Sequence, residues 1–294
     1  GCKFELLQGE VETLWADAPG LNERDKRRGR HLACQCRAKG PVSIKASTGK
    51  EYVPKVVPQR HKAQLVGSSD ITHDLREFRF RSTGGANFLP GQFAMLDLAG
   101  LDASRAYSLS NTANDDGEWH FQVRRVPHGK GTHVLFDKLA CGDEIGLDGP
   151  YGVAWLRTES PRDIVCVAGG SGLAPMVSIA RGAAEAGMLK DRKLYFFYGA
   201  RTPRDVCGRE MLAQLEGFGD RIVYLPVVSL PGDDGEWQGE TGFVHDLVAR
   251  ALPGSLAGFE FYFAGPPPMT QALQEMLMVG HRVPFEQIHF DRFF

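Results

Sequence analysis

The stretch from Ile164 to Ala180 contains no charged residue and is interrupted by Gly169, Gly170, Gly172 and Pro175. It is shorter than the roughly 20 apolar residues that a membrane-spanning helix needs. Turn-forming residues in its middle favour another reading, namely an apolar strand, a glycine turn and the start of a buried helix. The stretch therefore predicts a strand–turn–helix unit of a soluble protein, with no membrane span.

The same alternation of strand and helix continues to the end of the chain. Apolar strand-like segments recur with helical segments between them, which predicts βαβ units and a parallel sheet. We assign residues 158–294 to this α/β domain. The expected strands are 164–168, 193–198, 222–228 and 259–264. One expected helix follows the glycine turn and ends at Ala186, and the others span 209–218, 244–252 and 269–279.

The preceding part of the chain has a different pattern. Residues 77–81 alternate charged and apolar side chains, as in a half-buried strand, and short strand-like segments at 92–98 and 119–126 are separated by glycine turns. This pattern predicts a small antiparallel barrel or sandwich over residues 60–157. Pro54 and Pro58 exclude a regular helix in residues 51–61, which we interpret as a linker after a first block, residues 1–52.

Charge and cysteine usage narrow the class further. The formal net charge of −2 gives no general attraction to nucleic acid, and the basic run 24–31 has no interleaved aromatic residue. A solvated face is the favoured interpretation of this run, and a docking patch for an acidic redox partner is the alternative. The six cysteines are scattered, and no signal peptide pattern is present, so we expect a cytoplasmic protein.

The segment Arg105-Ala106-Tyr107-Ser108 joins a cation, an aromatic ring and a hydroxyl on one short strand. Such groups suit a flat cofactor with two phosphates, because a guanidinium binds phosphate and a ring can stack. Taken alone, the segment is better interpreted as a half-buried strand with a surface arginine. Downstream, Gly129-Lys130-Gly131-Thr132 forms a glycine turn before a helical segment, 132–139, whose free amides could bind phosphate. An ordinary capped helix with Thr132 near its N-cap is the alternative.

A second group of motifs lies in the α/β domain. The segment 168–175, Ala-Gly-Gly-Ser-Gly-Leu-Ala-Pro, has the strand–turn–helix layout of a dinucleotide pyrophosphate site, although Pro175 replaces the last glycine of the usual pattern. A tight turn without a ligand would look the same. Residues 198–201 and 264–269 follow two other predicted strands, at the carboxyl edge where open α/β sheets bind ligands.

Taken together, RAYS, GKGT, GGSGLAP, YGAR and AGPPPM resemble, in this order, the ferredoxin–NADP reductase superfamily over residues 60 to 294. The closer resemblance is to reductase components of bacterial toluene-type aromatic and alkene monooxygenases. It implies an α+β multidomain chain with a partial β-grasp ferredoxin domain, an antiparallel FAD barrel and an α/β nicotinamide domain. It also implies electron transfer from NADH through FAD to an oxygenase hydroxylase, or to a Rieske-type or other ferredoxin component.

The resemblance assigns roles by position. Arg105 would hold the FAD pyrophosphate, Tyr107 would stack on the isoalloxazine, and Ser108 would bond near flavin N5. Asp291 and Phe293 fall where relatives place a terminal acid and an aromatic residue near the flavin. The remaining cofactor-binding positions, for FAD or the dinucleotide, are Ala106, Arg124, Gly129, Gly131, Thr132, Gly170, Ser171, Gly172, Leu173, Ala174, Pro175, Gly199, Ala200, Arg201, Gly265, Pro266, Pro267 and Met269.

The first block resembles the back part of a plant-type ferredoxin. In that family four cysteines bind a [2Fe–2S] cluster. Cys2 and Cys34 match two of the ligands, whereas Cys36 does not match one. We therefore expect the chain as written to bind FAD and oxidise NADH without holding a stable cluster, and we expect residues 3–52 to be loosely ordered unless they dock.

Two questions of function stay open at this level. NADH is favoured over NADPH because the YGAR segment resembles NADH-using reductases, while Arg201, Arg204 and Asp205 together leave the charge argument undecided. The alternative functions are a general NAD(P)H-dependent ferredoxin or dye reductase, and a non-enzymatic flavin-binding electron-relay subunit. The intact GGSGLAP and AGPPPM segments argue against the non-enzymatic subunit.

Overall fold

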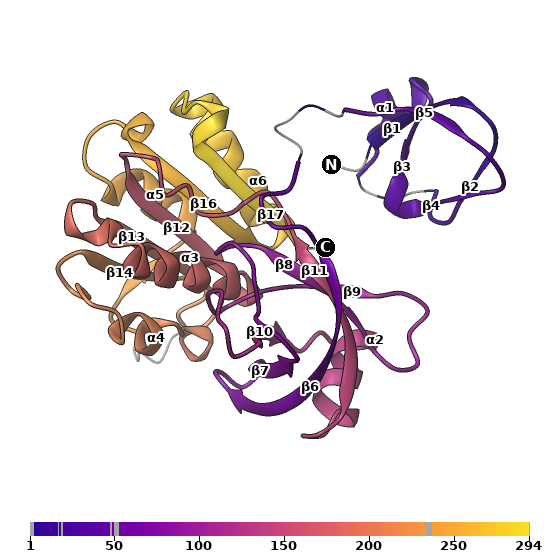
Figure 1. The fold of residues 1–294 in the computed structure, drawn as a ribbon. Coiled ribbons are helices and arrows are strands. Elements are labelled where there is room, and N and C mark those ends of the chain that lie inside the picture. Colours follow the sequence, from indigo (N-terminus) through magenta and orange to yellow (C-terminus); the bar gives the residue numbers. More distant parts are fainter. Residues whose placement is uncertain are drawn as a thin grey trace. The chain divides into compact units, whose positions relative to one another are not determined.

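The computed structural model describes residues 3–16, 18, 20–47, 49, 53–232 and 237–293, with the backbone alone at Cys34 and Arg292. The chain divides into two compact units, Gly1–Lys55 and Val56–Phe294. Figure 1 labels the elements of both units, and each unit is described by itself.

The first unit is built around strand β1 (Lys3–Gln8), which pairs antiparallel with β3 (Arg30–Leu32) and β5 (Ser43–Lys45). A second ribbon pairs β2 (Val11–Thr13) with β4 (Cys36–Ala38), and the short segment η1 (Ala33–Gln35) links β3 to β4. The described residues of this unit thus form strands of definite register.

Helix α1 (Glu23–Arg27) of this unit carries a buried carboxylate in the middle of the basic run. The Asp25 carboxylate accepts hydrogen bonds from Lys3 Nζ at 2.6 Å and from Arg30 Nη1 at 3.0 Å. These two cations hold the pKa of Asp25 below its usual value against the opposing effect of burial. Part of the basic run therefore has a structural partner inside the unit.

The second unit begins with a six-stranded antiparallel sheet in the order β10-β7-β6-β11-β8-β9. A bridge between Leu109 and Phe121 brings its two edges together, so the sheet is a nearly closed barrel. Phe78, Phe80 and Trp119 fill its interior because alternate residues of each strand point inward. The strands are β6 (Gln59–Asp70), β7 (Leu75–Ser82), β8 (Phe93–Asp97), β9 (Arg105–Ser108), β10 (Glu118–Arg124) and β11 (Glu144–Tyr151).

The barrel leads into a six-stranded parallel sheet in the order β15-β14-β13-β12-β16-β17. Helices cover both faces: α3 and α4 share one buried core with the sheet, and α5 and α6 share the other. The strands are β12 (Asp163–Gly169), β13 (Leu194–Ala200), β14 (Ile222–Val228), β15 (Glu240–Thr241), β16 (Phe259–Gly265) and β17 (Ile288–Arg292). The helices are α3 (Leu173–Glu185), α4 (Arg209–Ala213), α5 (Val244–Ala251) and α6 (Pro267–Gln274).

Short helical turns occupy several connections of this unit. Helix α2 (Lys130–His133) continues into a π-helical turn, η3 (Val134–Lys138), and α6 continues into another, η8 (Glu275–Gly280). The remaining turns are η4 (Gly170–Gly172), η5 (Met188–Lys190), η6 (Pro203–Asp205), η7 (Leu256–Gly258) and η9 (Phe285–Gln287).

Some predicted boundaries are wrong. Strand β6 begins at Gln59, inside the expected linker, because only Pro58 and the residues before it interrupt regular pairing. The helix expected over 209–218 ends at Ala213, five residues before Phe218, and two glycines with positive φ, Gly217 and Gly219, follow. Within the described part of the chain, no helix is both long and apolar enough to cross a membrane.

The order of the parallel strands positions the candidate site. Strand β12 is the first strand of this sheet in the chain, and it lies between β13 on one side and β16 on the other. The chain runs from β12 through β13 and β14 to β15 on one side of β12 and then crosses to β16 on its other side, so the strand order reverses at β12. In open α/β sheets, ligands bind beyond the carboxyl ends of the strands at such a point.

Candidate functional site

The glycine loop lies at the carboxyl end of β12. Gly170 has a φ of 57°, and a Cβ atom at Gly172 would stand 1.9 Å from the Ala264 carbonyl oxygen of β16. Only glycine fits this approach, which lets the loop turn directly into α3. The Leu173 amide donates within this turn, to the carbonyl oxygens of Gly170 and Ser171, and the positive end of the α3 dipole lies directly at the loop, which favours a bound phosphate.

The AGPPPM turn lies beside this loop, because β16 is the neighbour of β12. A Cβ atom at Gly169 would stand 2.7 Å from the Met269 sulfur, and one at Gly265 would stand 2.6 Å from the Met269 methyl group. Pro266 is the N-cap of α6, and Pro267 opens the helix with its fixed φ. The structure thus brings together two predicted segments that are about 95 residues apart in the sequence.

The carboxyl-terminal strand reaches the same edge. Asp291 pairs in register with Ala264, and the Phe293 amide donates a hydrogen bond to the Gly265 carbonyl oxygen at 3.2 Å. Burial raises the pKa of the Asp291 carboxyl to about 6. A carboxyl with this pKa can exchange a proton near neutral pH, directly beside the turn that follows β16.

The YGAR segment ends β13, the other neighbour of β12. Gly199 is closely approached by Val244 of α5, and Ala200 is buried, whereas Arg201 is exposed. The Tyr198 hydroxyl accepts a hydrogen bond from the Cys207 thiol at 3.2 Å, and burial raises the pKa of Tyr198. The segment therefore presents one exposed guanidinium, that of Arg201, just beyond the carboxyl end of β13.

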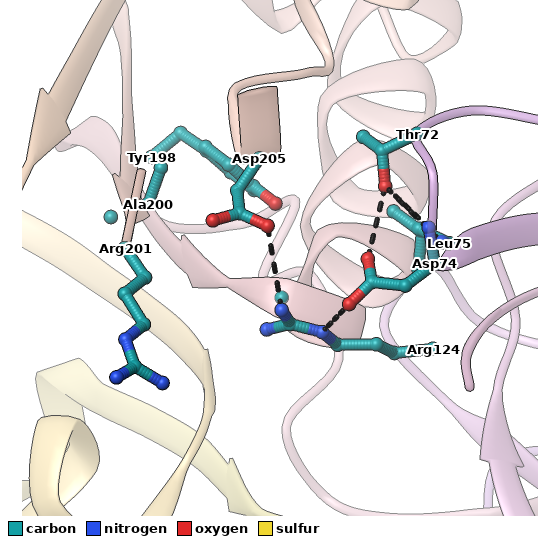
Figure 2. Close-up of a pocket in the computed structure, with 10 residues that line it drawn as sticks. Thr72, Asp74, Leu75, Arg124, Tyr198, Ala200, Arg201 and Asp205 are labelled. Carbon is teal, nitrogen blue, oxygen red and sulfur yellow. Dashed lines mark hydrogen bonds and ion pairs between the residues drawn. The ribbon is translucent and has the colours of Figure 1, made fainter. Parts of the chain in front are cut away.

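A small pocket lies where the barrel meets the ends of β12 and β13, as Figure 2 shows. Arg124 of β10 crosses it, donating from Nε to Asp74 at 2.7 Å and from Nη2 to Asp205 at 3.4 Å. One guanidinium thereby joins the turn between β6 and β7 to the segment after β13. The lining residues are Thr72, Asp74, Leu75, Arg124, Gly170, Tyr198, Gly199, Ala200, Arg201 and Asp205.

Both carboxylates of the pocket are held in place. Asp205 accepts hydrogen bonds from the backbone amide and the hydroxyl of Thr202, at 2.8 and 2.6 Å, and these bonds with Arg124 lower its pKa despite burial. Burial opposes the charge of Arg124, but Asp74 and Asp205 raise its pKa. Sequence patterns did not predict Asp74 and Asp205 as residues of the site. The spacing Thr202-x-x-Asp205 is typical of a capping box, so the local role of Asp205 could have been predicted from the sequence.

The predicted flavin residues gather on the barrel. Arg105 and Tyr107 are half-buried and share one face of β9, whereas Ala106 is exposed and Ser108 is buried. A Cβ atom at Gly131 would stand 2.8 Å from the Tyr107 hydroxyl oxygen and 3.3 Å from Arg105 Cγ. The RAYS strand and the GKGT turn are therefore adjacent, as a shared ligand site requires.

The protonation states of these residues suit a bound dinucleotide. Burial raises the pKa of Tyr107 to about 12 against the lowering effect of Arg105, so the phenol keeps its proton at neutral pH. The Arg105 guanidinium uses Nη1 on the carbonyl oxygens of Ala103 and Ser104, at 2.8 and 3.2 Å. A half-exposed ring, a guanidinium and a glycine that keeps the space between them open fit FAD.

Thr132 does not lie at the N-cap, the position that the alternative interpretation of this turn gave it. Helix α2 starts at Lys130 with Gly129 as its N-cap, so Thr132 lies inside the first turn. Its hydroxyl accepts from the Val126 amide at 3.3 Å and donates to the Gly129 carbonyl oxygen at 3.1 Å. The threonine shapes the loop before the helix, and its side chain is engaged with the backbone of that loop.

A basic hollow opens beside this turn. It is lined by Arg125, Val126, Pro127, His128, Gly129, Lys130, Thr132, His133 and Asp137. His128 adopts a φ of 61°, which is uncommon for a residue with a side chain and is typical of functional loops. Sequence patterns did not predict this hollow. The signal that could have indicated it is the cluster of Arg125, His128 and Lys130 close to the GKGT segment.

The two predicted metal ligands cannot be compared with the structure in full. Cys2 lies outside the described residues, and only the backbone of Cys34, in η1, is described. Cys36, Cys141, Cys166 and Cys207 are free thiols, of which Cys166 and Cys207 are buried in the parallel-sheet domain.

The antiparallel barrel presents Arg105, Tyr107 and Gly131 together, and the parallel sheet that follows carries a glycine loop at the end of its first strand. This combination defines an oxidoreductase with FAD- and NAD-binding domains. Residues 62–155 match the family described as oxidoreductase FAD-binding domain, and residues 166–275 match the oxidoreductase NAD-binding domain.

Individual proteins agree with this class. The ferredoxin–NAD(P)(+) reductase of Metapseudomonas resinovorans is 42% identical over 100% of this chain and 87% of its own length. The ferredoxin–NAD(+) reductase component of the alkene monooxygenase system of Xanthobacter autotrophicus is 36% identical over 99% of this chain and 88% of its own length. The solved structure of the ferredoxin reductase in carbazole 1,9a-dioxygenase matches with a TM-score of 0.88 and 39% identity, covering 100% of this chain and 86% of that chain. The chain belongs to the ferredoxin–NAD(P)+ reductase family, and the predicted resemblance, fold class and enzyme class are confirmed.

Proposed function

We propose that this enzyme takes hydride from NADH at the carboxyl edge of the parallel sheet and delivers electrons, through FAD on the barrel, to a component of an oxygenase system. The observation that carries the proposal is the convergence of the glycine loop, the AGPPPM turn and Asp291 on this edge. FAD supplies the ability to accept two electrons together and to release them one at a time.

On the barrel, Arg105 is proposed to bind the FAD pyrophosphate and Tyr107 to cover the isoalloxazine. Ser108 is buried at the end of the same strand and is proposed to hydrogen-bond near N5. The amides of Gly129 to Thr132 and the basic hollow beside them are proposed to hold the phosphate and adenosine end, because backbone amides and cations favour negative charge.

On the sheet, the loop from Gly170 to Pro175 is proposed to bind the NADH pyrophosphate, with N–H groups from its residues before Pro175 as donors and Arg124 supplying the positive charge from the barrel side. Arg124 Nη1 would lie 3.3 Å from a Cβ atom at Gly170, so its guanidinium lies against the loop. Gly265, Pro266, Pro267 and Met269 are proposed to line the nicotinamide approach, and Asp291 and Phe293 to close it from the carboxyl-terminal strand.

A preference for NADH over NADPH is proposed from Asp205. Its lowered pKa keeps the carboxylate ionised in the pocket that Ala200 and Arg201 also line. A carboxylate just after β13, the second strand of the sheet in chain order, can accept a hydrogen bond from a ribose hydroxyl but repels a 2′-phosphate. A higher kcat/KM for NADPH than for NADH would contradict this preference.

The partner is proposed to be an oxygenase hydroxylase or a ferredoxin, because the relatives named above serve an alkene monooxygenase and a carbazole dioxygenase. The free thiols of Cys36, Cys141, Cys166 and Cys207 suit the reducing cytoplasm, where we propose that the protein works. Recovery of the protein in an oxidising compartment would contradict this location.

Cys2 and Cys34 are proposed as two of the four thiolates of a plant-type [2Fe–2S] cluster. The first unit contains only one further cysteine, Cys36, so these 294 residues cannot supply four thiolates from that unit. Iron and sulfide analysis of the purified 294-residue chain should therefore give far less than two irons per FAD. Two irons per FAD would mean that other ligands complete the site.

The decisive experiment is anaerobic mixing of the FAD-loaded chain with NADH. Rapid bleaching of the flavin absorbance is expected, followed by reoxidation when an electron acceptor is added. Absence of bleaching would support the alternative of a non-enzymatic electron relay. Bleaching with NADH, together with equal rates for every ferredoxin and dye tested, would support a general reductase instead.

A further inference from the structure

Helix α3 connects the two halves of the proposed site. It begins at the glycine loop, and further along it presents Ser178, Arg181, Gly182 and Glu185 to the barrel. These positions are spaced as i, i+3, i+4 and i+7, so they form one stripe along the helix. Figure 1 shows α3 on the side of the sheet that faces the barrel strands.

Ser178 is fully buried in this interface. Its hydroxyl donates a hydrogen bond to the Asn111 carbonyl oxygen at 2.7 Å and accepts one from the Gly91 amide at 3.3 Å. Asn111 follows the carboxyl end of β9, and Gly91 precedes β8. One hydroxyl group thus binds the chain just before β8 and just after β9, which lie side by side at one end of this antiparallel pair. Strand β9 carries the proposed flavin residues.

Arg181 makes the neighbouring contact. Its Nη1 donates a hydrogen bond at 2.8 Å to the Ser110 carbonyl oxygen, two residues beyond Ser108. By the rise of an α-helix, Arg181 lies about 12 Å along the axis from Leu173, the first residue of α3. The same rigid rod therefore touches the dinucleotide loop at one end and the flavin strand further along.

The rest of the stripe keeps this contact close. A Cβ atom at Gly182 would stand 2.4 Å from Pro90 Cγ, so glycine lets the helix pack directly on the turn before β8. At the end of the stripe, the Thr112 hydroxyl donates to Glu185 at 2.7 Å. Strand β9 pairs with β8, and the residues after it are tied to β10 by the Leu109–Phe121 bridge and by the hydrogen bond from the Ser110 amide to the His120 carbonyl oxygen at 2.8 Å, so the contacts with α3 add a further support to this end.

We propose that Ser178 and Arg181 are positioning residues for hydride transfer, which hold the end of β9 and thereby set the flavin ring at Ser108 against the nicotinamide bound at the other end of α3. This inference rests on the proposed function. Ser178 is fully buried, and both side chains are bonded to carbonyl oxygens of the barrel backbone. Their effect should therefore be on the rate of the chemical step, which falls steeply when reacting atoms are misplaced by about 1 Å.

The test uses the full chain loaded with FAD and compares the wild type with Arg181→Ala and Ser178→Ala. Stopped-flow absorbance measures flavin reduction per bound flavin at saturating NADH, and visible circular dichroism of the oxidised flavin measures ring placement without turnover. Each variant should reduce flavin about 10- to 100-fold more slowly with an altered dichroism spectrum. The KM for NADH should change less than about threefold, because uniform binding contacts are unaffected.

Two further variants separate positioning from general damage. Arg181→Lys keeps a cationic donor for the Ser110 carbonyl oxygen and should recover most of the rate. Arg192→Ala is the matched control, since Arg192 Nη1 donates to the Thr158 carbonyl oxygen at 3.2 Å in the same domain without touching β9. It should behave as the wild type.

Unchanged reduction rates and dichroism in both alanine variants would overturn the inference. It would also be overturned if slow reduction came only from lost FAD, with a normal rate per bound flavin. If Arg181→Ala does not fold, Ser178→Ala, which removes a single hydroxyl, decides by the same measurements. A wild-type chain that is not bleached by NADH would instead overturn the proposed function, and the positioning role with it.

Discussion

Gly172 lies so close to Ala264 that a methyl group on residue 172 would stand 1.9 Å from the Ala264 carbonyl oxygen. This contact joins the start of α3 to the end of β16, and it requires hydrogen as the side chain. The two loops that are proposed to hold NADH are thereby locked to each other through their backbones.

Gly172→Ala should accordingly both destabilise the protein and weaken the use of NADH. The backbone must move to admit the methyl group, and overpacking of this kind costs about 1–3 kcal/mol or more. Urea denaturation and the KM for NADH measure the two effects. Gly258→Ala is the control, because a Cβ atom there has open space. Wild-type stability and KM in Gly172→Ala would show that the approach is less strict than the structure indicates.

Arg105→Ala should lose FAD. Hydrogen bonds to charged groups contribute about 1.5–3 kcal/mol, so the Kd for FAD should rise about 10- to 100-fold. Fluorescence titration of the apoprotein measures this constant. Arg60→Ala is the matched control, since the Arg60 side chain is 89% exposed on β6 of the same barrel. Equal FAD affinity of the two variants would exclude Arg105 as a phosphate ligand.

Asp205→Asn should shift the ratio of kcat/KM values toward NADPH by about tenfold, which corresponds to about 1.4 kcal/mol. The asparagine oxygen can still accept both hydrogen bonds from Thr202, whereas its NH2 group replaces the oxygen that accepts from Arg124, so the variant removes the negative charge and the bond to Arg124 together. Asp220→Asn, at an 85% exposed carboxylate before β14, removes the same charge at the opposite edge of the sheet and should leave the ratio unchanged. A ratio that is equal in both variants would assign the selectivity to other residues.

Asp291→Asn should remove a pH dependence. The pKa of Asp291 is raised to about 6 in the folded protein, so the stability linked to its proton is fully present below about pH 4 and is lost as pH rises through 6. Above pH 7 the asparagine variant should be more stable than the wild type, by at most about 3 kcal/mol and by less where solvent reaches the carboxyl. Thermal unfolding between pH 4 and 8 tests this.

The rate of flavin reduction should follow the same titration. An inflection near pH 6 is expected for the wild type and should be absent in Asp291→Asn, because the variant has no carboxyl to titrate. The same inflection in both proteins would place the titrating group elsewhere. FAD content per chain, measured at each pH, is the control that separates protonation from cofactor loss.

Local patterns were enough to predict much of this protein. Period-two alternation in residues 77–81 and apolar runs such as 259–264 predicted strands that the structure contains, because burial of alternate or all side chains leaves a direct mark on the sequence. The order of RAYS, GKGT, GGSGLAP, YGAR and AGPPPM was sufficient for the family. Glycines and prolines record backbone requirements locally, so these turns are visible without a structure.

Other features were decided only when the chain folded. Arg124 meets Asp74 and Asp205 across separations of 50 and 81 residues, and Arg181 meets Ser110 across 71, so no local period records these pairs. A place near an N-cap was the alternative interpretation of Thr132, because hydroxyls favour that place, but the helix begins at Lys130 and the hydroxyl bonds the loop. The raised pKa of Asp291 likewise depends on the surrounding protein, since burial is a property of the assembled fold and of no single segment.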